Sequence, residues 1–258
     1  LKLLKNRNFG TAVFLQLILG MVLFGSTVLI PQYLQTMLGY TAERAGQVLS
    51  PAGLVMMVMM AIAGRTLGKG DPRLTVMLGY LAVAAGLYNL TRLDLNSAFG
   101  TVTWWRMLQV VGLPFIFIPI STLNYVGVPR EKSNQISSLS NFARNIGGSA
   151  GTALLTTFLA RNAQVNQNSL AANISNGSYA LNTYISSFAA GIHAGFGAAQ
   201  SSAMASAYNQ MVRQANMLAY KNAFALLAFV LVVLSPLVWI MRLPPKRAKI
   251  DPEQLAAH

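Results

Sequence analysis

An all-α membrane protein with a bundle of six transmembrane helices is predicted by three observations. Hydrophobic residues make up 54% of the 258 residues and charged residues only 10%, well below the roughly 25% of a soluble domain. The apolar residues form blocks about as long as the ~20 residues that cross the hydrocarbon core of a bilayer. Short charged connectors separate these blocks. We therefore expect a six-helix bundle with a long helical outer segment between the fifth and sixth spans.

Each predicted span is one of these apolar blocks. In chain order the spans are residues 9–30, 47–63, 74–90, 102–126, 138–160 and 219–241. The first span is too long and too rich in polar residues for a cleaved signal peptide. Because the chain starts at Leu1 rather than methionine, and Lys2 and Lys5 lead straight into that span, we expect residues 1–258 to be a single membrane domain and a fragment of a longer protein.

The positive charges indicate which side of the membrane each connector occupies. There are 19 Lys and Arg residues against 6 Asp and Glu, a formal net charge of +13. With the spans threaded alternately, twelve cations fall on one set of connectors, five on the opposite set and two inside spans. The positive-inside rule then predicts that both chain ends are cytoplasmic, with a cytoplasmic tail at residues 242–258 and an extramembrane outer segment at residues 161–218.

The outer segment has an unusual composition. Residues 162–212 contain no Asp, Glu, Lys or Arg and are rich in Ala, Ser, Asn and Gln. Apolar residues recur at three- and four-residue steps, which predicts amphipathic helices lying against the membrane or a partner, and a poorly ordered loop is the alternative. These apolar residues are Leu170, Ile174, Leu181, Ile185, Phe188 and Ile192. We reject a seventh span at residues 180–208, because it would move the basic tail to the outer side.

Several functions are disfavoured by the residue types. The basic residues lie at the ends of apolar blocks and not on one folded face, so no nucleic-acid binding is expected. There is no cysteine, and the only histidines are His193 and His258, so we expect neither an enzyme nor a metal or cofactor site. All six carboxylates lie outside the spans, so a proton-carrying acid would have to come from elsewhere in the complete protein.

Two arginines do lie inside spans. Arg106 follows two tryptophans that suit the outer interface, so its side chain either extends to that interface or faces a cavity. Arg144 lies deeper, between Asn141 and Asn145. An arginine there costs about 3 kcal/mol or more unless it faces a wet cavity or a partner. We expect these four residues to line or brace a substrate cavity.

Uncharged polar residues and helix-disturbing residues complete the candidate site. Residues expected to line a path, or else to hydrogen-bond between helices, are Gln16, Gln32, Tyr33, Gln35, Gln109 and Asn124. Residues expected to bend, pack or flex helices are Pro114, Pro119, Gly147, Gly148 and Gly151.

Five segments carry a resemblance to a known family. The connector at residues 64–73 reads GRTLGKGDPR, and residues 106–112 read RMLQVVG, similar to an Arg-x-x-Gln-x-x-Gly pattern. Further matches are SLSNFARNIGG at 138–148, QANMLAY at 214–220 and IPQYLQ at 30–35. Together they resemble the C-terminal half of EmrB/QacA-type multidrug exporters, the fourteen-span drug:proton antiporter branch of the major facilitator superfamily.

The resemblance implies a function and its partners. Such proteins export hydrophobic or cationic drugs across the bacterial inner membrane by alternating access, with the proton gradient as energy source and no cofactor. The expected partners are the lipid bilayer, the missing N-terminal half, small-molecule drugs, and a periplasmic adaptor with an outer-membrane channel. The alternative is a non-transporting membrane scaffold subunit that docks a periplasmic partner.

Two positions depart from the family pattern. Gly68 and Asn222 stand where an aspartate is usual. We therefore expect the cytoplasmic gate loop to depend on other residues, with less ionic locking than in relatives. These are Gly64, Arg65, Lys69, Asp71 and Arg73.

Overall fold

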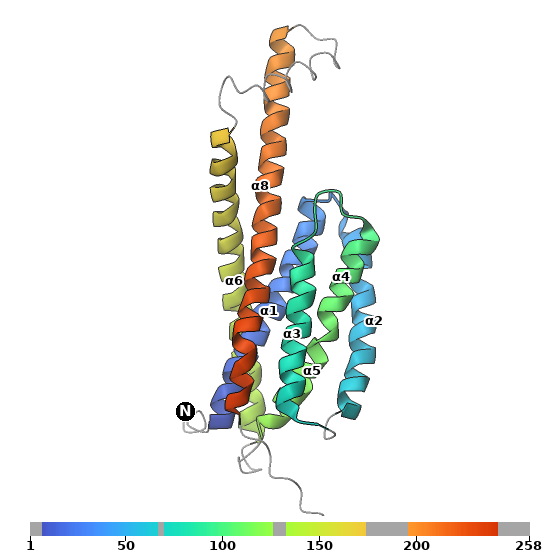
Figure 1. The fold of residues 1–258 in the computed structure, drawn as a ribbon, viewed down its shortest axis with the longest axis vertical. Helices are drawn as coiled ribbons and strands as arrows, with labels where there is room; N and C mark the ends of the chain where they lie inside the picture. Colours follow the sequence, from blue (N-terminus) through green and yellow to red (C-terminus); the bar gives the residue numbers. More distant parts are fainter. Residues whose placement is uncertain (1–6, 67–69, 126–132, 174–195, 242–258) are drawn as a thin grey trace, which may run out of the picture.

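The computed structural model describes residues 7–66, 70–125, 133–173 and 196–241, and all regular structure in these residues is helical. The elements are α1 (Arg7–Thr36), α2 (Ala42–Thr66), α3 (Pro72–Leu90), α4 (Phe99–Val111), α5 (Leu113–Leu123), α6 (Ser133–Asn173), α8 (Phe196–Leu234) and the short 3₁₀ helix η3 (Ser235–Ile240). The helices run side by side and alternate in direction (Figure 1). The predicted all-α membrane bundle is confirmed.

Among the described residues, five helical segments are long and apolar enough to cross a membrane. They are Asn8–Thr36, Ala42–Thr66, Pro72–Leu90, Phe99–Leu123 and Met204–Ile240. The predicted fifth span lies in α6, which does not reach this apolarity because Ser, Asn, Thr and Gly are frequent along it. It is nevertheless packed along α1 and α8 within the bundle (Figure 1).

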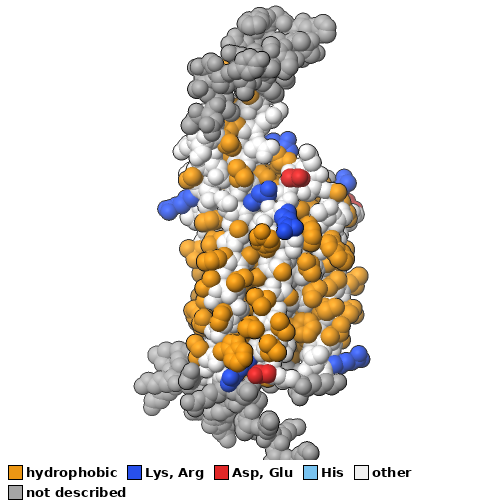
Figure 2. Space-filling model, viewed as in Figure 1, with side chains coloured by type: hydrophobic (Ala, Val, Ile, Leu, Met, Phe, Trp, Pro, Cys, Tyr) orange, Lys and Arg blue, Asp and Glu red, His pale blue; other side chains and the backbone are white. Residues whose placement is uncertain are grey.

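The bundle has an apolar belt with charges at its two ends. In the view of Figure 2 hydrophobic side chains cover the middle of the molecule, and Lys, Arg, Asp and Glu side chains lie above and below it. The first and last described residues, Arg7 and Met241, lie at the same end of the bundle (Figure 1). A belt of this kind is expected of a multi-pass membrane protein.

The predicted fourth span is divided into two helices. α4 ends at Val111, and α5 begins at Leu113 with Pro114 in its first turn. Proline lacks an N–H and disfavours helical backbone in the preceding residue, so the α4 hydrogen-bond pattern stops here. Pro119, in contrast, lies inside α5 without interrupting it.

The helices on either side of the outer segment are longer than the predicted spans. Residues 162–173 continue α6, and residues 196–218 belong to α8. No proline occurs in either stretch, so nothing stops the helices at the end of the apolar belt. α6 has 41 residues and α8 has 39, so each helix is about 60 Å long at 1.5 Å per residue. The hydrocarbon core of a bilayer is only about 30 Å thick.

We call residues 162–173 of α6 and 204–218 of α8 the α6–α8 arm, whose outer part extends beyond the other helices (Figure 1). Of the apolar residues expected in the outer segment, Leu170 lies within the described residues. The others lie outside them, namely Ile174, Leu181, Ile185, Phe188 and Ile192. The predicted tail at residues 242–258 and Lys69 of the connector between α2 and α3 also lie outside the described residues.

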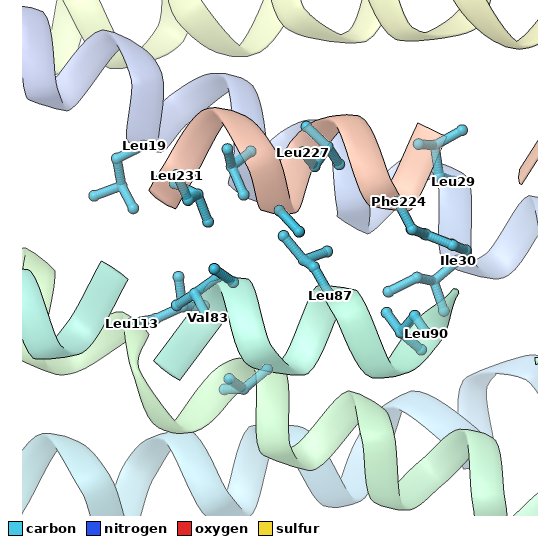
Figure 3. Packing of buried hydrophobic residues seen from close by; sticks show 14 of the residues in the cluster. Leu19, Leu29, Ile30, Val83, Leu87, Leu90, Leu113, Phe224, Leu227 and Leu231 are labelled. Atoms are coloured by element: carbon cyan, nitrogen blue, oxygen red, sulfur yellow. The ribbon is translucent and has the colours of Figure 1, made fainter. Parts of the chain in front are cut away.

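The core of the bundle joins α8 to α1 and α3. Leu227 and Leu231 of α8 are fully buried and Phe224 is 1% exposed. They face Leu87 of α3 and Leu29 of α1 (Figure 3). This apolar contact fixes α8 in the bundle, since closely packed side chains cannot shift without loss of contacts.

Glycines allow the backbones of α1 and α6, and those of α3 and α4, to approach closely. A Cβ on Gly20 of α1 would overlap the carbonyl oxygen of Arg144, and a Cβ on Gly147 of α6 would overlap the carbonyl oxygen of Leu17. In α3, a Cβ on Gly86 would lie 2.6 Å from the backbone nitrogen of Gln109. Small residues allow such backbone approach in membrane bundles.

Candidate functional site

A stripe of polar residues runs along one face of α6. Its members are Asn134, Ser138, Asn141, Asn145, Ser149, Thr152 and Thr156. Thr152 is half-buried and the other six are exposed. Their steps of three and four residues place them on one helix face. From first to last the stripe covers about 33 Å at 1.5 Å per residue, close to the ~30 Å of a bilayer core.

This stripe lies beside the contact of α6 with α1. Gly147 and Gly148 face α1, where a Cβ on Gly148 would overlap the ring of Phe24. The face of α6 opposite to the stripe carries exposed apolar residues such as Leu154. The hydroxyls of Ser149, Thr152 and Thr156 donate to backbone carbonyls of α6. Exposed asparagine amides are unfavourable in hydrocarbon, so the apolar face suits lipid and the stripe suits water or a protein partner.

Arg144 connects three helices next to this stripe. Its Nε donates to the Gln16 side-chain oxygen of α1 at 3.1 Å, and its Nη2 donates to the Asn141 side-chain oxygen at 3.0 Å. The guanidinium carbon also lies 4.4 Å from the centre of the Phe117 ring of α5. The arginine is thus held by two neutral oxygens and an aromatic face.

No carboxylate pairs with Arg144 in the described part of the chain. Glu43 begins α2, Asp71 precedes α3 and Asp94 lies between α3 and α4, so all three described acids are at the ends of the bundle. Gln16 is 0% exposed, and its Nε2 has no hydrogen-bond partner. Among the described residues, the site therefore combines a positive charge that no carboxylate neutralises with a buried donor that has no partner.

A groove lies along the contact of α1 and α6, and Arg144 and Gln16 are not among the residues that line it. It has a volume of about 540 Å³ and is lined by Phe24, Val28, Asn145, Gly148, Ser149, Thr152, Ala153 and Thr156. The α1 side of the groove is apolar, while most of the α6 side belongs to the polar stripe. Such a combination suits an amphiphilic ligand.

Arg106 turns into the bundle. Its Nη1 donates to the side-chain oxygen of Gln109, which is 1% exposed, and its Nε is buried without a partner. Trp104, in contrast, is 60% exposed. Arg106 and Gln109 therefore form a pair within α4, apart from the residues that line the groove.

Three other predicted path residues lie in different surroundings. Asn124 is 2% exposed and donates to Ser140 of α6 at 3.0 Å. Gln32 and Gln35 are exposed near the end of α1. None of these three lines the groove.

Tyr33 is a buried cross-link and does not line the groove. It is 1% exposed, and its hydroxyl donates to the backbone carbonyl of Asp94 at 2.9 Å. Its ring meets the Tyr220 ring edge-on with 5.6 Å between centroids. Tyr33 thus ties α1 to α8 and to the α3–α4 connector.

The described part of the gate loop is organised around the start of α3. The Asp71 side chain accepts from the backbone N–H of Arg73 at 2.9 Å and so caps α3. Gly64 and Arg65 are exposed at the end of α2. The Nε of Arg73 is buried without a partner. Lys69 is outside the described residues.

Hydrogen bonds hold the α6–α8 arm together and attach it to the rest of the bundle. Gln167 donates to the Tyr208 hydroxyl at 2.8 Å, and Asn222, the residue that departs from the family pattern, donates to the Asn162 side chain at 3.2 Å. Arg213 donates to the carbonyl of Met37 just beyond α1 at 3.1 Å. That carbonyl is at the negative end of the α1 dipole, which favours a cation.

Most of the polar stripe was not predicted from the sequence. The prediction included Asn141 and Asn145 and left out Asn134, Ser138, Ser149, Thr152 and Thr156. The repeated three- and four-residue spacing of polar residues is the signal that would have identified them. Gly20 was also missed, because its role depends on the backbone of a distant helix.

Comparisons with known proteins agree with this architecture. Residues 1–152 match the family described as Major Facilitator Superfamily. The chain is 29% identical over 95% of its length to Multidrug export protein EmrB of Escherichia coli K12, and 28% over 96% to Probable multidrug resistance protein EmrY of the same strain. It is 27% identical over 95% to Fatty acid resistance protein FarB of Neisseria gonorrhoeae. The chain spans about half the length of these relatives, 47% to 48%. The predicted resemblance to EmrB-type exporters is confirmed.

Proposed function

Because this chain belongs to the Major Facilitator Superfamily, we propose that it supplies one helical bundle of an exporter for hydrophobic or cationic drugs. The bundle rocks against a second bundle, so that a cavity between them opens to one side of the membrane and then to the other, driven by protons. The exporter lies in the bacterial inner membrane, with the end that carries Arg7 and Met241 in the cytoplasm. The names of relatives, which refer to drugs and fatty acids, support a broad range of amphiphilic substrates.

The polar stripe of α6 is the observation that carries this proposal. It extends across the thickness of a bilayer core and stays exposed, beside a groove with one apolar side. Lipid would solvate the exposed amides of Asn134, Asn141 and Asn145 poorly, whereas the hydroxyls of Ser149, Thr152 and Thr156 already donate to backbone carbonyls of α6. A water-filled cavity between two bundles gives the amides water and substrate as partners.

Proton coupling requires acids from outside the described spans. The described carboxylates Glu43, Asp71 and Asp94 all lie at bundle ends. We propose that a carboxylate in another part of the complete protein carries the proton and attracts cationic drugs. Asp71, Arg65, Arg73 and Lys69 then form the cytoplasmic gate.

Efflux of a fluorescent cation tests the transport proposal. The complete gene product that contains this chain is expressed in cells that lack their own multidrug pumps, and loss of ethidium is followed with and without the proton gradient. We expect faster loss than with an empty vector, and the difference should disappear when the gradient is collapsed. Equal rates with and without the protein, across several substrates, would refute drug export.

Cysteine labelling tests the cavity itself, and the chain is convenient for this because it contains no cysteine. Ser149→Cys and Thr156→Cys are expected to react with a membrane-impermeant maleimide. Leu154→Cys is the matched control, because Leu154 is exposed on the opposite face of α6 and should be shielded by lipid. Equal labelling of all three positions would mean that the stripe is not a wet surface.

The α6–α8 arm supports a role for a partner in the periplasm. Its exposed residues include Val165 and Tyr208. Arg213 is the only Lys or Arg among the residues of the arm. We propose that a periplasmic adaptor, which leads to an outer-membrane channel, docks on this arm. Deletion of residues 166–208 should remove adaptor capture while efflux in an adaptor-independent assay persists. Adaptor capture by an intact protein that exports nothing would favour the scaffold alternative.

A further inference from the structure

We infer that Arg144 forms an ion pair with a carboxylate that a membrane-spanning helix of the second bundle presents at the same depth in the bilayer. This inference rests on the proposed function, because it needs the polar stripe of α6 to face that bundle. It goes further by naming the residue of this chain at which the two bundles make a charged contact.

The charge of Arg144 has no counter-ion in the described part of the chain. Its two side-chain hydrogen bonds go to the neutral oxygens of Gln16 and Asn141. The helices around it, α1, α5 and α6, contain no Asp or Glu, and their other charged residues are the cations Arg7 and Arg161. Charged residues inside membrane proteins usually pair with one another or face a wet cavity. A carboxylate is therefore the group that this position lacks.

The guanidinium of Arg144 has donors left for such a partner. An arginine carries five N–H bonds, and Gln16 and Asn141 accept one each. The Phe117 ring lies 4.4 Å from the guanidinium carbon, and an aromatic face attracts the charge without neutralising it. Arg144 is only half-buried. A carboxylate can accept two parallel hydrogen bonds from a guanidinium and also neutralises its charge.

The backbone of α6 is held in place at this residue. A Cβ on Gly20 of α1 would overlap the carbonyl oxygen of Arg144, so the two helices are in backbone contact here. Gln16, one helical turn before Gly20, accepts from the Nε of Arg144 at 3.1 Å and is 0% exposed. The arginine is thus presented from a fixed position. This favours an ion pair, because ordering two long side chains otherwise offsets much of their attraction.

Depth and direction exclude a lipid head group as the counter-ion. Arg144 comes eleven residues after Ser133, the first residue of α6, so it lies about 16 Å along that helix. Its side chain extends sideways, to Gln16 of α1 and to the Phe117 ring of α5. A carboxylate at this depth must come from another membrane-spanning segment. This chain spans 47% to 48% of the length of EmrB and EmrY, and we place that segment in the second half.

Double-mutant cycles in the complete gene product test the ion pair. Each Asp or Glu in a predicted span of the second bundle is replaced by Asn or Gln, alone and together with Arg144→Gln. The Tm of each purified variant is measured by fluorescence-detected size exclusion. We expect one carboxylate whose replacement lowers Tm by about 3 °C or more, as Arg144→Gln does, because each change leaves one charge without its partner. The double variant should melt above both single variants, since neither charge remains.

Arg161→Gln is the matched control, because Arg161 is exposed on the same helix. Its loss changes the net charge equally, and its effect on Tm should add to that of replacing the same carboxylate. Arg144→Lys keeps the charge without the planar fork, so it should lower Tm less than Arg144→Gln.

Disulfide cross-linking gives a reading that leaves Arg144 in place, and so it stands even if Arg144→Gln aggregates. Asn141 is exposed one helical turn from Arg144. Asn141→Cys is combined, in a cysteine-free gene product, with a cysteine one turn from each carboxylate of the second bundle in turn. We expect one pair to form a disulfide on mild oxidation, which needs Cα atoms within about 7 Å. Leu154→Cys, on the opposite face of α6, should form none with the same partners.

Additive effects of Arg144→Gln and every one of these carboxylates would overturn the inference, and the counter-ion of Arg144 would then be a free anion or water. The absence of any disulfide from Asn141→Cys would overturn it independently. Drug efflux that persists with either of these results would leave the proposed function standing. A coupled, cross-linked pair in a protein that exports none of the tested drugs would refute the proposed function and leave the ion pair intact.

Discussion

Substitution of Gly147 by alanine should destabilise the protein more than the same change at an open position. A Cβ at Gly147 would overlap the carbonyl oxygen of Leu17. This neighbour is helix backbone and cannot rotate away, so α1 and α6 must separate along their contact. Insertion of atoms into a close-packed contact typically costs about 1–3 kcal/mol. For a domain of 150–250 residues, each kcal/mol lowers Tm by about 2–4 °C, so we expect Tm to fall by roughly 2–12 °C.

Gly53→Ala in α2 is the control, because a Cβ there meets nothing within 4 Å. Alanine is a better helix former than glycine by up to about 1 kcal/mol, so Tm should stay the same or rise. Thermal unfolding of the purified full gene product in detergent, followed by fluorescence-detected size exclusion, measures both variants. If Gly147→Ala and Gly53→Ala have the same Tm, the α1–α6 contact is looser than the backbone geometry requires, and our account of the crossing is wrong.

Three further changes probe hydrogen bonds of the bundle. Tyr33→Phe removes the donor to the Asp94 carbonyl, and we expect a loss of about 1 kcal/mol in an SDS unfolding titration; no change in midpoint would contradict this. Arg213→Gln removes the hydrogen bond from the arm to the end of α1. Backbone amides in the last turn of α1 should then exchange faster in hydrogen–deuterium exchange. Unaltered protection of these amides would mean that the Arg213 hydrogen bond does not stabilise the end of α1. A double-mutant cycle of Asn124→Leu and Ser140→Ala should give a coupling free energy of about 0.6 kcal/mol, the average for hydrogen bonds in a membrane protein. If the two substitutions lower the stability additively, this hydrogen bond does not contribute.

Much of the bundle follows from composition because hydrocarbon imposes simple requirements on a chain. Apolar blocks of about 20 residues predicted the first four spans with boundaries within six residues of the helical segments, since each block must satisfy its own backbone hydrogen bonds. The ends of α6 and α8 were not predictable in this way. Beyond the apolar belt, Ala, Gln and Asn allow the helix to continue, and only a proline or a glycine would have marked its end.

The site was less predictable, since it depends on pairs of helices. Arg144 was recognised as costly to bury, but its partner Gln16 lies 128 positions away. Tyr33 looked like a path residue because it lies among glutamines and a proline; it is instead buried against the Asp94 carbonyl. Gly147 was expected to pack against another helix, and only the three-dimensional arrangement identifies that helix as α1.

The uninterrupted length of α8 has a mechanical consequence. A rod of about 58 Å, from 39 residues at 1.5 Å each, behaves as a lever with its fulcrum at the buried leucines that pack on α3. A tilt of about 5° around residue 229 displaces the distant end by about 4 Å and the near end by less than about 1 Å. Motion at the distant end is therefore reduced roughly seven-fold at the packed end, and Arg213 links the distant half to the end of α1.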